Sequence, residues 1–406
     1  MEPRSARCCI VGGGPAGMML GLLLGRAGID VIVLEKHADF LRDFRGDTIH
    51  PSTLEIMHEL GLLEAFLKLP HQRVTTLNAR FGATELTLAD FTHLPTHCGF
   101  IALMPQWDFL DFLAREAARY PAFRLSMEAE ATGLIEEAGR IVGVRAEAPE
   151  GALEIRADLV VGADGRHSTV RQAAGLAVEE LGAPLDVLWF RLPRVSGDPQ
   201  DTAIRFGSGQ LLVMLNRGDY WQVGYGIAKG SIDKLRARGL PELHRHIAEI
   251  APFIRDRVGE LDDWEKIKLL TVRVDRLKRW HRAGLLCIGD AAHAMSPVGG
   301  VGINLAIQDA VAAANLLHEP LRNRSLTEAD LARVERRREL PTRSIQRMQI
   351  LVQNQVIANV LTSDGAPSPP LLLRIMGHWP WFRRLAARLI GVGIRPEHVL
   401  TPARRP

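Results

Sequence analysis

The sequence has few cysteines and no long apolar run. Its 406 residues contain four cysteines, Cys8, Cys9, Cys98 and Cys287. They are too few and too scattered for a disulfide framework, and no pair has zinc-ligand spacing with nearby histidines. No segment reaches the roughly 18 uninterrupted apolar residues that a membrane-spanning helix needs. These absences predict a reducing, cytoplasmic protein with no metal centre and no transmembrane segment.

The net charge of +3 hides an uneven distribution of charge. Residues 321–406 hold 15 arginines, no lysine and six acidic residues, a net charge of +9, which leaves −6 for the rest of the chain. A basic region of this kind more often packs against the acidic remainder of its own chain than binds nucleic acid. We therefore expect no nucleic-acid partner, and we keep contact with a membrane surface through residues 321–406 as an alternative.

A glycine-rich turn stands between the first two expected strands. Residues 6–11 are typical of a buried strand, residues 15–28 of a helix and residues 30–35 of a second strand. Glu35 ends that second strand and can hydrogen-bond a ribose. The turn lets the backbone and the helix N-terminus approach a pyrophosphate. This pattern predicts a dinucleotide site for FAD or NAD at Gly12, Gly14, Pro15, Ala16, Gly17 and Glu35.

Two later segments narrow that prediction. Residues 162–171 read GADGRHSTVR, and residues 289–297 read GDAAHAMSP. Together with the first turn, they resemble the single-component FAD-dependent aromatic hydroxylases, the para-hydroxybenzoate hydroxylase-like flavoprotein monooxygenases. The resemblance extends from residue 6 to about residue 310. It implies an α/β fold, in which a Rossmann-like FAD-binding domain is interrupted by a mixed β-sheet substrate domain and followed by a helical C-terminal region.

The resemblance also implies which residues hold the cofactor. In the family, the second segment lies by the pyrophosphate and helps the nicotinamide cofactor to dock, whereas the third segment holds the ribityl chain. The matching residues here are Asp164, Gly165, Arg171 and Asp290. Arg45 and Gln106 match family residues that contact FAD.

A glycine-rich loop and a helix follow the third segment. Their free N–H groups at a positive helix end can face the pyrimidine side of the flavin and stabilise its anionic reduced form. The residues concerned are Pro297, Gly299, Gly300, Gly302, Ile303 and Asn304.

The expected domains are discontinuous in sequence. The FAD-binding domain takes residues 1–75, 101–178 and 273–320, the substrate-binding sheet takes 76–100 and 179–272, and the helical C-terminal region takes 321–406. Strand candidates separated by glycine-containing turns fill residues 185–228. Polar side chains that could anchor a substrate on the inner face of this sheet, with strand alternation deciding which point inward, are Arg191, Arg205, Gln222 and Tyr225.

Two local signals concern helix ends. Ser52 followed by Glu55 three residues later predicts a capping box at the start of a helix. Pro341 predicts a break in the otherwise helical C-terminal region, because proline lacks the N–H that a helix interior needs.

The resemblance implies a complete reaction. NADH or NADPH would reduce FAD, O₂ would add to give a flavin hydroperoxide, and one oxygen atom would pass to a small aromatic or phenolic substrate. The flavin carries this chemistry, so we assign no catalytic side chain and expect His293 to be structural. Two alternatives stay open: a flavin reductase or dehydrogenase of the same fold, for example one acting on isoprenoid double bonds, and a non-catalytic flavin-binding redox regulator.

Overall fold

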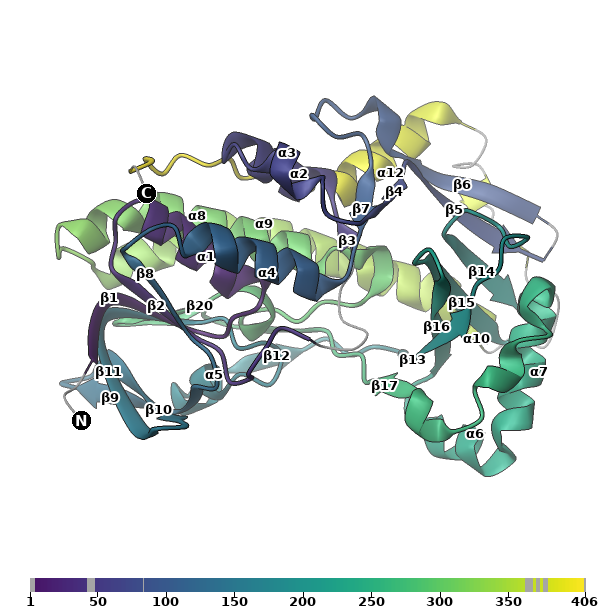
Figure 1. The fold of residues 1–406 in the computed structure, drawn as a ribbon, viewed down its shortest axis with the longest axis horizontal. Helices are drawn as coiled ribbons and strands as arrows, with labels where there is room; N and C mark the ends of the chain where they lie inside the picture. The colour runs from purple at the N-terminus through teal and green to yellow at the C-terminus, as the bar shows by residue number, and fades with distance from the viewer. Residues whose placement is uncertain are drawn as a thin grey trace.

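A computed structural model describes residues 4–41, 48–82, 84–361, 368–369, 373–374 and 379–404. Figure 1 shows two sheets at opposite ends of the molecule, with the long helices α8 (Gly302–Arg322) and α9 (Glu328–Val352) beside the first sheet and α9 extending towards the second. The fold is α/β, and the C-terminal region is helical, as the sequence predicts. Arg45 lies outside the described residues.

The first sheet is parallel except for the edge strand β19 and the β9–β10 hairpin, which are antiparallel to their neighbours. Its order is β19-β20-β11-β1-β2-β8, and β9 and β10 form a hairpin extension of β11. The strands are β1 (Arg4–Val11), β2 (Val31–Leu34), β8 (Phe123–Ser126), β9 (Glu130–Glu137), β10 (Arg140–Ala148), β11 (Gly151–Gly162), β19 (His281–Arg282) and β20 (Leu285–Cys287).

The carboxyl ends of three parallel strands of this sheet meet in register. Val11 at the end of β1 pairs with Gly162 at the end of β11, and Gly162 pairs with Cys287 at the end of β20. The three sequence motifs begin directly after these strands. Open parallel sheets bind ligands at this edge, so the fold itself brings the motifs together.

Apolar helices cover the first sheet. Helix α1 (Pro15–Arg26) is buried over nearly its whole length and packs against α8 and α4 (Gln106–Ala117). Gly21 and Gly25 of α1 leave room for Phe123, because an added Cβ would lie 2.8 and 2.9 Å from that side chain. The segment Val298–Arg322 is long and apolar enough to cross a membrane, but 78% of its apolar window is buried within the protein. That burial is typical of a core helix.

The second sheet forms from strands on both sides of the second motif. Its order is β17-β13-β16-β15-β14-β5-β6, antiparallel except for the parallel pair β14 and β5. The strands are β5 (Thr76–Phe81), β6 (Thr84–Asp90), β13 (Leu185–Pro193), β14 (Ala203–Gly207), β15 (Gln210–Asn216), β16 (Tyr220–Ala228) and β17 (Lys268–Leu270). The four strands expected within residues 185–228 are all present.

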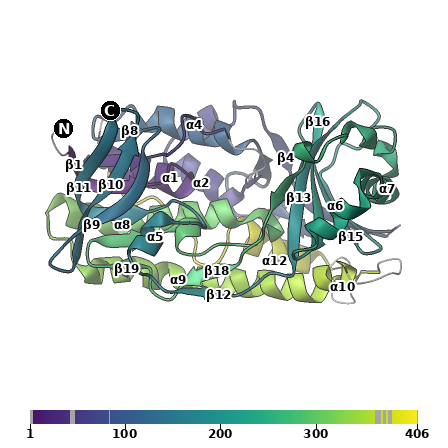
Figure 2. The same ribbon diagram turned by 90° about the horizontal axis from the view of Figure 1, so that it is seen from below.

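The two faces of the second sheet have different neighbours. The face that we call outer packs Leu188, Phe190 and Val223 against α7 (Leu240–Ile250) and the segments around it, including α6 (Ile232–Arg238). The opposite face, called inner, packs Val187 and Leu211 against the C-terminal helices. Figure 2 shows α6 and α7 beyond the second sheet and α9 and α10 (Ala358–Leu361) along the opposite side.

Short elements join the two sheets. A three-stranded sheet contains β3 (Thr48–Ile49), β4 (Gln72–Val74) and β7 (Ile101–Leu103), and β12 (Val178–Glu180) pairs with β18 (Asp275–Leu277). The remaining helical elements are α2 (Pro51–Glu59), α3 (Leu63–Phe66), α5 (Thr169–Ala173), the π-helical η7 (Gln353–Ile357), α12 (Pro380–Gly391) and the 3-10 turns η1 (Phe91–His93), η2 (Pro252–Ile254), η3 (Val258–Glu260), η4 (Trp264–Lys266), η5 (Gly289–Ala291) and η6 (Val298–Gly300).

Two predictions about helix ends were wrong. Helix α2 begins at Pro51 after His50, without a side-chain cap, and Glu55 instead accepts the His97 backbone N–H at 3.0 Å. A proline in the first turn has no N–H to satisfy, which reduces the need for a cap. Pro341 is buried inside the continuous helix α9, where packing along α8 offsets the missing hydrogen bond.

Candidate functional site

The first glycine turn closes tightly on the end of β11. Gly12 has a φ of +108°, and an added Cβ would lie 2.4 Å from the Ala163 carbonyl oxygen. A Cβ on Gly17 would lie 1.9 Å from the Gly12 carbonyl oxygen, so α1 can pack here only through glycine. Gly14 is the N-cap residue of α1 and leaves the N–H groups of the first turn without a side-chain cap. An anion can therefore occupy this helix end.

Glu35 follows β2 and fastens the same turn. One carboxylate oxygen accepts the Gly13 N–H at 3.0 Å, and the other accepts the His37 N–H at 3.1 Å. The side chain is half-buried beside the turn. Its negative charge thus lies within reach of a ribose held by the α1 N-terminus.

A cavity of about 170 Å³ opens further along the first sheet, and none of the predicted site residues lines it. Its lining residues are Ser126, Met127, Ala129, Ala148, Glu150, Gly151 and Leu153.

Asp164 is the most informative residue of the second motif. Its Oδ2 accepts the Val170 N–H at 3.1 Å, and burial raises the pKa of its carboxyl group. Its Oδ1 is buried and has no hydrogen-bond partner within the described part of the chain. Gly165 follows with a φ of +83° and open space around its Cα. A buried acceptor beside open space at a strand's carboxyl edge fits the hydroxyl groups of a dinucleotide.

An ion pair joins the second and third motifs. Arg166 Nη2 lies 3.4 Å from Asp290 Oδ2, and both side chains are about one-third exposed, at 29% and 30%. Arg171, by contrast, is 5% exposed. Its guanidinium donates to Asp275 Oδ1 at 3.3 Å and to the Arg166 carbonyl oxygen. Arg171 therefore supports the motif from inside the protein, while Asp290 lies at its accessible edge.

The loop after the third motif turns through two left-handed glycines. Gly299 and Gly300 have φ values of +80° and +61°. The Thr48 hydroxyl donates to the Gly300 carbonyl oxygen at 2.7 Å, and an added Cβ on Gly300 would meet that hydroxyl at 2.5 Å. Pro297 precedes the turn, and α8 begins at Gly302 without a side-chain cap. The loop thus presents a second uncapped helix N-terminus.

The two residues that follow are turned into the protein. Ile303 is 8% exposed and Asn304 is 4% exposed. The Asn304 side-chain oxygen accepts the His50 N–H at 3.0 Å and the Thr53 hydroxyl at 2.7 Å. Asn304 therefore ties α8 to the start of α2.

Gln106 lies at the entry to α4. It is the first residue of that helix and is half-buried.

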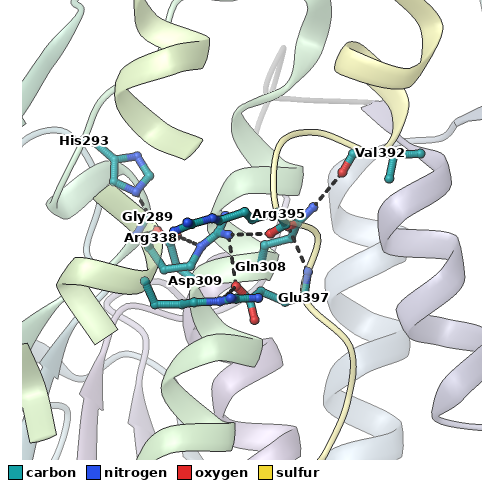
Figure 3. Close-up of polar contacts among 9 residues, drawn as sticks. Gly289, His293, Gln308, Asp309, Arg338, Val392, Arg395 and Glu397 are labelled. Carbon is teal, nitrogen blue, oxygen red and sulfur yellow. Dashed lines mark hydrogen bonds and ion pairs between the residues drawn. The ribbon is translucent and has the colours of Figure 1, made fainter. Parts of the chain in front are cut away.

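Sequence reasoning missed a buried charge cluster behind the third motif, which Figure 3 shows. Asp309 Oδ1 accepts Arg338 Nε at 2.9 Å, and its Oδ2 accepts the Gly289 N–H at 3.1 Å and lies 2.5 Å from His293 Nε2. Burial opposes ionisation of Asp309, but His293 and Arg338 hold its net pKa below the usual value. Arg338 also reaches Glu397 Oε1 at 3.3 Å.

This cluster anchors the C-terminal segment next to the flavin motif. Asp309 and Arg338 are both 0% exposed. The signal in the sequence was a single carboxylate in the otherwise apolar helix segment INLAIQDAVAAA, which a membrane or core helix would not carry unpaired.

Strand alternation separates the four predicted substrate residues. Tyr225 and Arg205, two of the four candidates, lie on the outer face. The Tyr225 hydroxyl is 3.1 Å from His246 Nδ1 of α7, and the Arg205 guanidinium lies 5.1 Å from the centre of the Phe253 ring. Arg191 and Gln222 pair on the opposite face.

Both of these inner-face residues contact other side chains of the protein. Arg191 is exposed, with its guanidinium 5.0 Å from the Tyr220 ring centre. Gln222 accepts Arg217 Nε at 3.1 Å.

Comparison with known proteins agrees with this arrangement. The family described as FAD binding domain matches residues 5–347. The 6-methylpretetramide 4-monooxygenase of Streptomyces rimosus is 33% identical over 386 residues, covering 94% of this chain and 91% of that protein. The chain belongs to the FAD-dependent aromatic hydroxylases.

More distant relatives share the fold and the same general activity. Para-nitrophenol 4-monooxygenase of Pseudomonas sp. (strain WBC-3) is 28% identical, covering 81% of this chain and 82% of that protein. The crystal structure of p-nitrophenol 4-monooxygenase PnpA from Pseudomonas putida DLL-E4 superposes with a TM-score of 0.78 at 20% identity, covering 95% and 97% of the two chains. This hydroxylase family member is thus an FAD-dependent flavoprotein monooxygenase, and the PnpA structure shares its fold over most of its length.

Proposed function

We propose that this flavoprotein uses NADH or NADPH and O₂ to hydroxylate a small aromatic or phenolic compound. The observation that carries the proposal is the meeting of three motifs at one edge of the first sheet, where Val11, Gly162 and Cys287 end in register. Bound FAD would supply the redox chemistry, taking hydride from the nicotinamide and activating oxygen for transfer.

The described residues suit the separate parts of FAD. Gly12, Gly14 and Gly17 would admit the pyrophosphate to the α1 N-terminus, and Glu35 would accept a ribose hydroxyl. Asp164 Oδ1 offers a buried acceptor, and Asp290 would bind the ribityl chain at the accessible edge. The uncapped N-terminus of α8 would face the ring system.

The chain itself would exclude water and orient the substrate. The inner face of the second sheet is apolar around Trp189 and Val213, and α12 packs over it through Ala387 and Ile390. We infer that residues 76–100 and 179–272 form the substrate side and that the C-terminal helices cover it. An apolar enclosure protects a reactive oxygen donor from hydrolysis and holds the ring close to it.

Steady-state turnover tests this proposal. The FAD-loaded protein should oxidise NADH or NADPH slowly alone and faster with a suitable phenol, consuming one O₂ per nicotinamide. Hydroxylated product should equal the nicotinamide consumed minus the peroxide released. If no phenolic or polycyclic aromatic compound raises the rate, the proposed activity is wrong.

The same experiment distinguishes the two alternatives. A reductase would consume nicotinamide without O₂ uptake and return a product with one double bond fewer. A redox regulator would show no acceptor-dependent turnover at all, and deletion of its basic tail would remove a partner without changing the flavin spectrum. Each of these results contradicts the monooxygenase proposal in a different measurement.

A further inference from the structure

Trp189 lies on the inner face of the second sheet, in the strand next to the edge strand β17. It belongs to β13 between Leu188 and Phe190, whose side chains pack on the outer face towards α7. Because successive side chains of a strand alternate, Trp189 points to the opposite side. There it packs against two apolar clusters, one shared with Val298 of the loop beside α8 and the other shared with Ile390 of α12.

The two clusters that Trp189 packs against also include residues of the loop beside α8 and of the C-terminal helix α12. Val298 belongs to the turn that would present N–H groups to the flavin ring. Ile390 belongs to the helix that packs over the inner face. A side chain that contacts both groups of residues borders the space where an aromatic substrate would have to lie.

The opposite strand accommodates the indole ring by means of a glycine. Trp189 pairs with Gly224 of β16, and a Cβ added to Gly224 would lie 3.1 Å from both Cη2 and Cζ3 of the indole. The six-membered ring therefore rests over the Gly224 backbone. The indole nitrogen belongs to the opposite edge of the ring system and is directed away from that contact.

The indole N–H has no partner there. Trp189 Nε1 is buried and makes no hydrogen bond to any described residue. Buried tryptophan N–H groups usually have a partner, and an exception calls for a ligand, a water molecule or an ion. The apolar side chains around it, which include Val213 and Leu215, offer no acceptor. A ligand or a water molecule that enters this space would supply one.

We propose that the Trp189 indole N–H binds an oxygen acceptor on the aromatic substrate, such as a ring carbonyl, carboxylate or phenolate oxygen, while the indole face forms an apolar wall. This inference rests on the proposed monooxygenase function and narrows its substrate class to rings that carry such an oxygen. Trp189 was not among the residues predicted from the sequence, which were polar side chains of these strands.

The test compares two probes with the same ring and carbon skeleton, 2-acetylnaphthalene, which has a carbonyl acceptor, and 2-ethylnaphthalene, which has none. Their dissociation constants are measured by perturbation of the flavin spectrum in the FAD-loaded protein. Trp189→Phe keeps an aromatic ring but removes the N–H. The substitution should raise the dissociation constant of 2-acetylnaphthalene about five- to tenfold and change that of 2-ethylnaphthalene less than about twofold.

Trp264→Phe is the matched control. Trp264 packs on the outer-face cluster, so its substitution should leave both constants unchanged. Equal affinity of Trp189→Phe and wild type for 2-acetylnaphthalene would overturn the inference while leaving the monooxygenase proposal intact. Failure of both probes to bind wild type would also count against it, because it requires an oxygen-bearing ring to bind here.

An independent readout follows the N–H directly. In protein labelled with ¹⁵N-tryptophan, the indole resonance missing from Trp189→Phe identifies Trp189. Addition of 2-acetylnaphthalene should shift that resonance downfield, whereas 2-ethylnaphthalene should not. A resonance that responds alike to both probes means that only the apolar wall contacts the ligand, and the proposed hydrogen bond is then wrong.

Discussion

At the carboxyl edge of the first sheet, Gly12 and Gly17 leave no space for a Cβ, and Asp164 holds an acceptor oxygen without a partner among the described residues. On the inner face of the second sheet, Val213, Leu215 and their neighbours make apolar contacts that many residue combinations could replace. A cofactor that always has the same shape requires particular residues at its binding site. A substrate that differs between relatives requires mainly an apolar surface of suitable shape. Single substitutions at the edge of the first sheet should therefore change ligand affinity strongly. Substitutions on the inner face of the second sheet should change it only slightly.

The strongest test of this contrast is Gly17→Ala. The new Cβ would lie 1.9 Å from a backbone oxygen, and separating them must displace α1 from the turn. Overpacking of this kind costs about 3 kcal/mol, which corresponds to FAD binding weakened by about 100-fold or more. Isothermal titration of the apoprotein with FAD measures the effect.

Gly133→Ala is the control for that substitution. Gly133 lies in β9 with nothing within 4 Å of an added Cβ, so FAD affinity should not change. If Gly17→Ala binds FAD as well as Gly133→Ala does, the turn is not the pyrophosphate site.

The buried charge cluster should be nearly as sensitive, but in stability. Arg338→Met leaves Asp309 buried with one partner fewer, which should lower the free energy of unfolding by about 3–5 kcal/mol in urea titration. Arg337→Met removes a pair to the same Glu397 from a side chain that is 43% exposed, and should cost about 0–1 kcal/mol. Equal effects of the two substitutions would show that the cluster does not anchor the tail.

Acidification should weaken the contact between α2, α8 and α12. Burial lowers the pKa of His50 to about 4 from 6.5, so the unfolded chain takes up its proton first as the pH falls. The stability contributed by neutral His50 is complete above pH 6.5 and is lost between pH 6.5 and about 4, up to about 3 kcal/mol. His50→Asn can still donate to the Ile390 carbonyl oxygen, which His50 Nδ1 contacts at 2.8 Å.

Unfolding by urea at pH 7 and pH 4.5 measures this loss. Wild type should lose more stability between the two pH values than His50→Asn, while the exposed His398→Asn behaves as wild type. An identical loss in wild type and His50→Asn would assign the acid sensitivity to other groups.

The smallest effect is expected from Tyr225→Phe, which separates the two faces of the second sheet. The Tyr225 hydroxyl contacts His246 on the outer face, and burial raises its pKa, so it stays protonated at neutral pH. Its loss should cost about 0.5–1.5 kcal/mol of stability and leave the KM for a phenolic substrate unchanged within about twofold. A tenfold rise in KM without a change in stability would place Tyr225 at the substrate.

The sequence predicted the first sheet and its motifs more completely than the side-chain directions of the second sheet, for physical reasons. Gly12, Gly17, Glu35 and Asp164 lie in short motifs whose spacing encodes a strand, a turn and a helix, so their place at the carboxyl edge of the first sheet could be predicted. In the second sheet, the alternation of apolar and polar residues predicted the strands. It did not predict which face of the sheet each side chain occupies.

Register explains that limit. Tyr225 and Gly224 are adjacent in β16, yet they face opposite sides of the sheet. The local sequence does not indicate which of these faces is turned towards the cofactor site. The contacts of Asp309 with Arg338 and of His50 with Ile390 join residues far apart in the chain. Only the assembled fold reveals such pairs.

We propose that the FAD site at the first sheet and the substrate site at the second sheet together allow one oxygen atom to pass from O₂ to an aromatic ring. The most direct test of this proposal is turnover of the FAD-loaded protein with NADPH or NADH under ¹⁸O₂, followed by mass spectrometry of the product. Our account predicts one ¹⁸O atom per hydroxylated product and none from H₂¹⁸O. A product without ¹⁸O, or a reduced product formed equally well without oxygen, would contradict it.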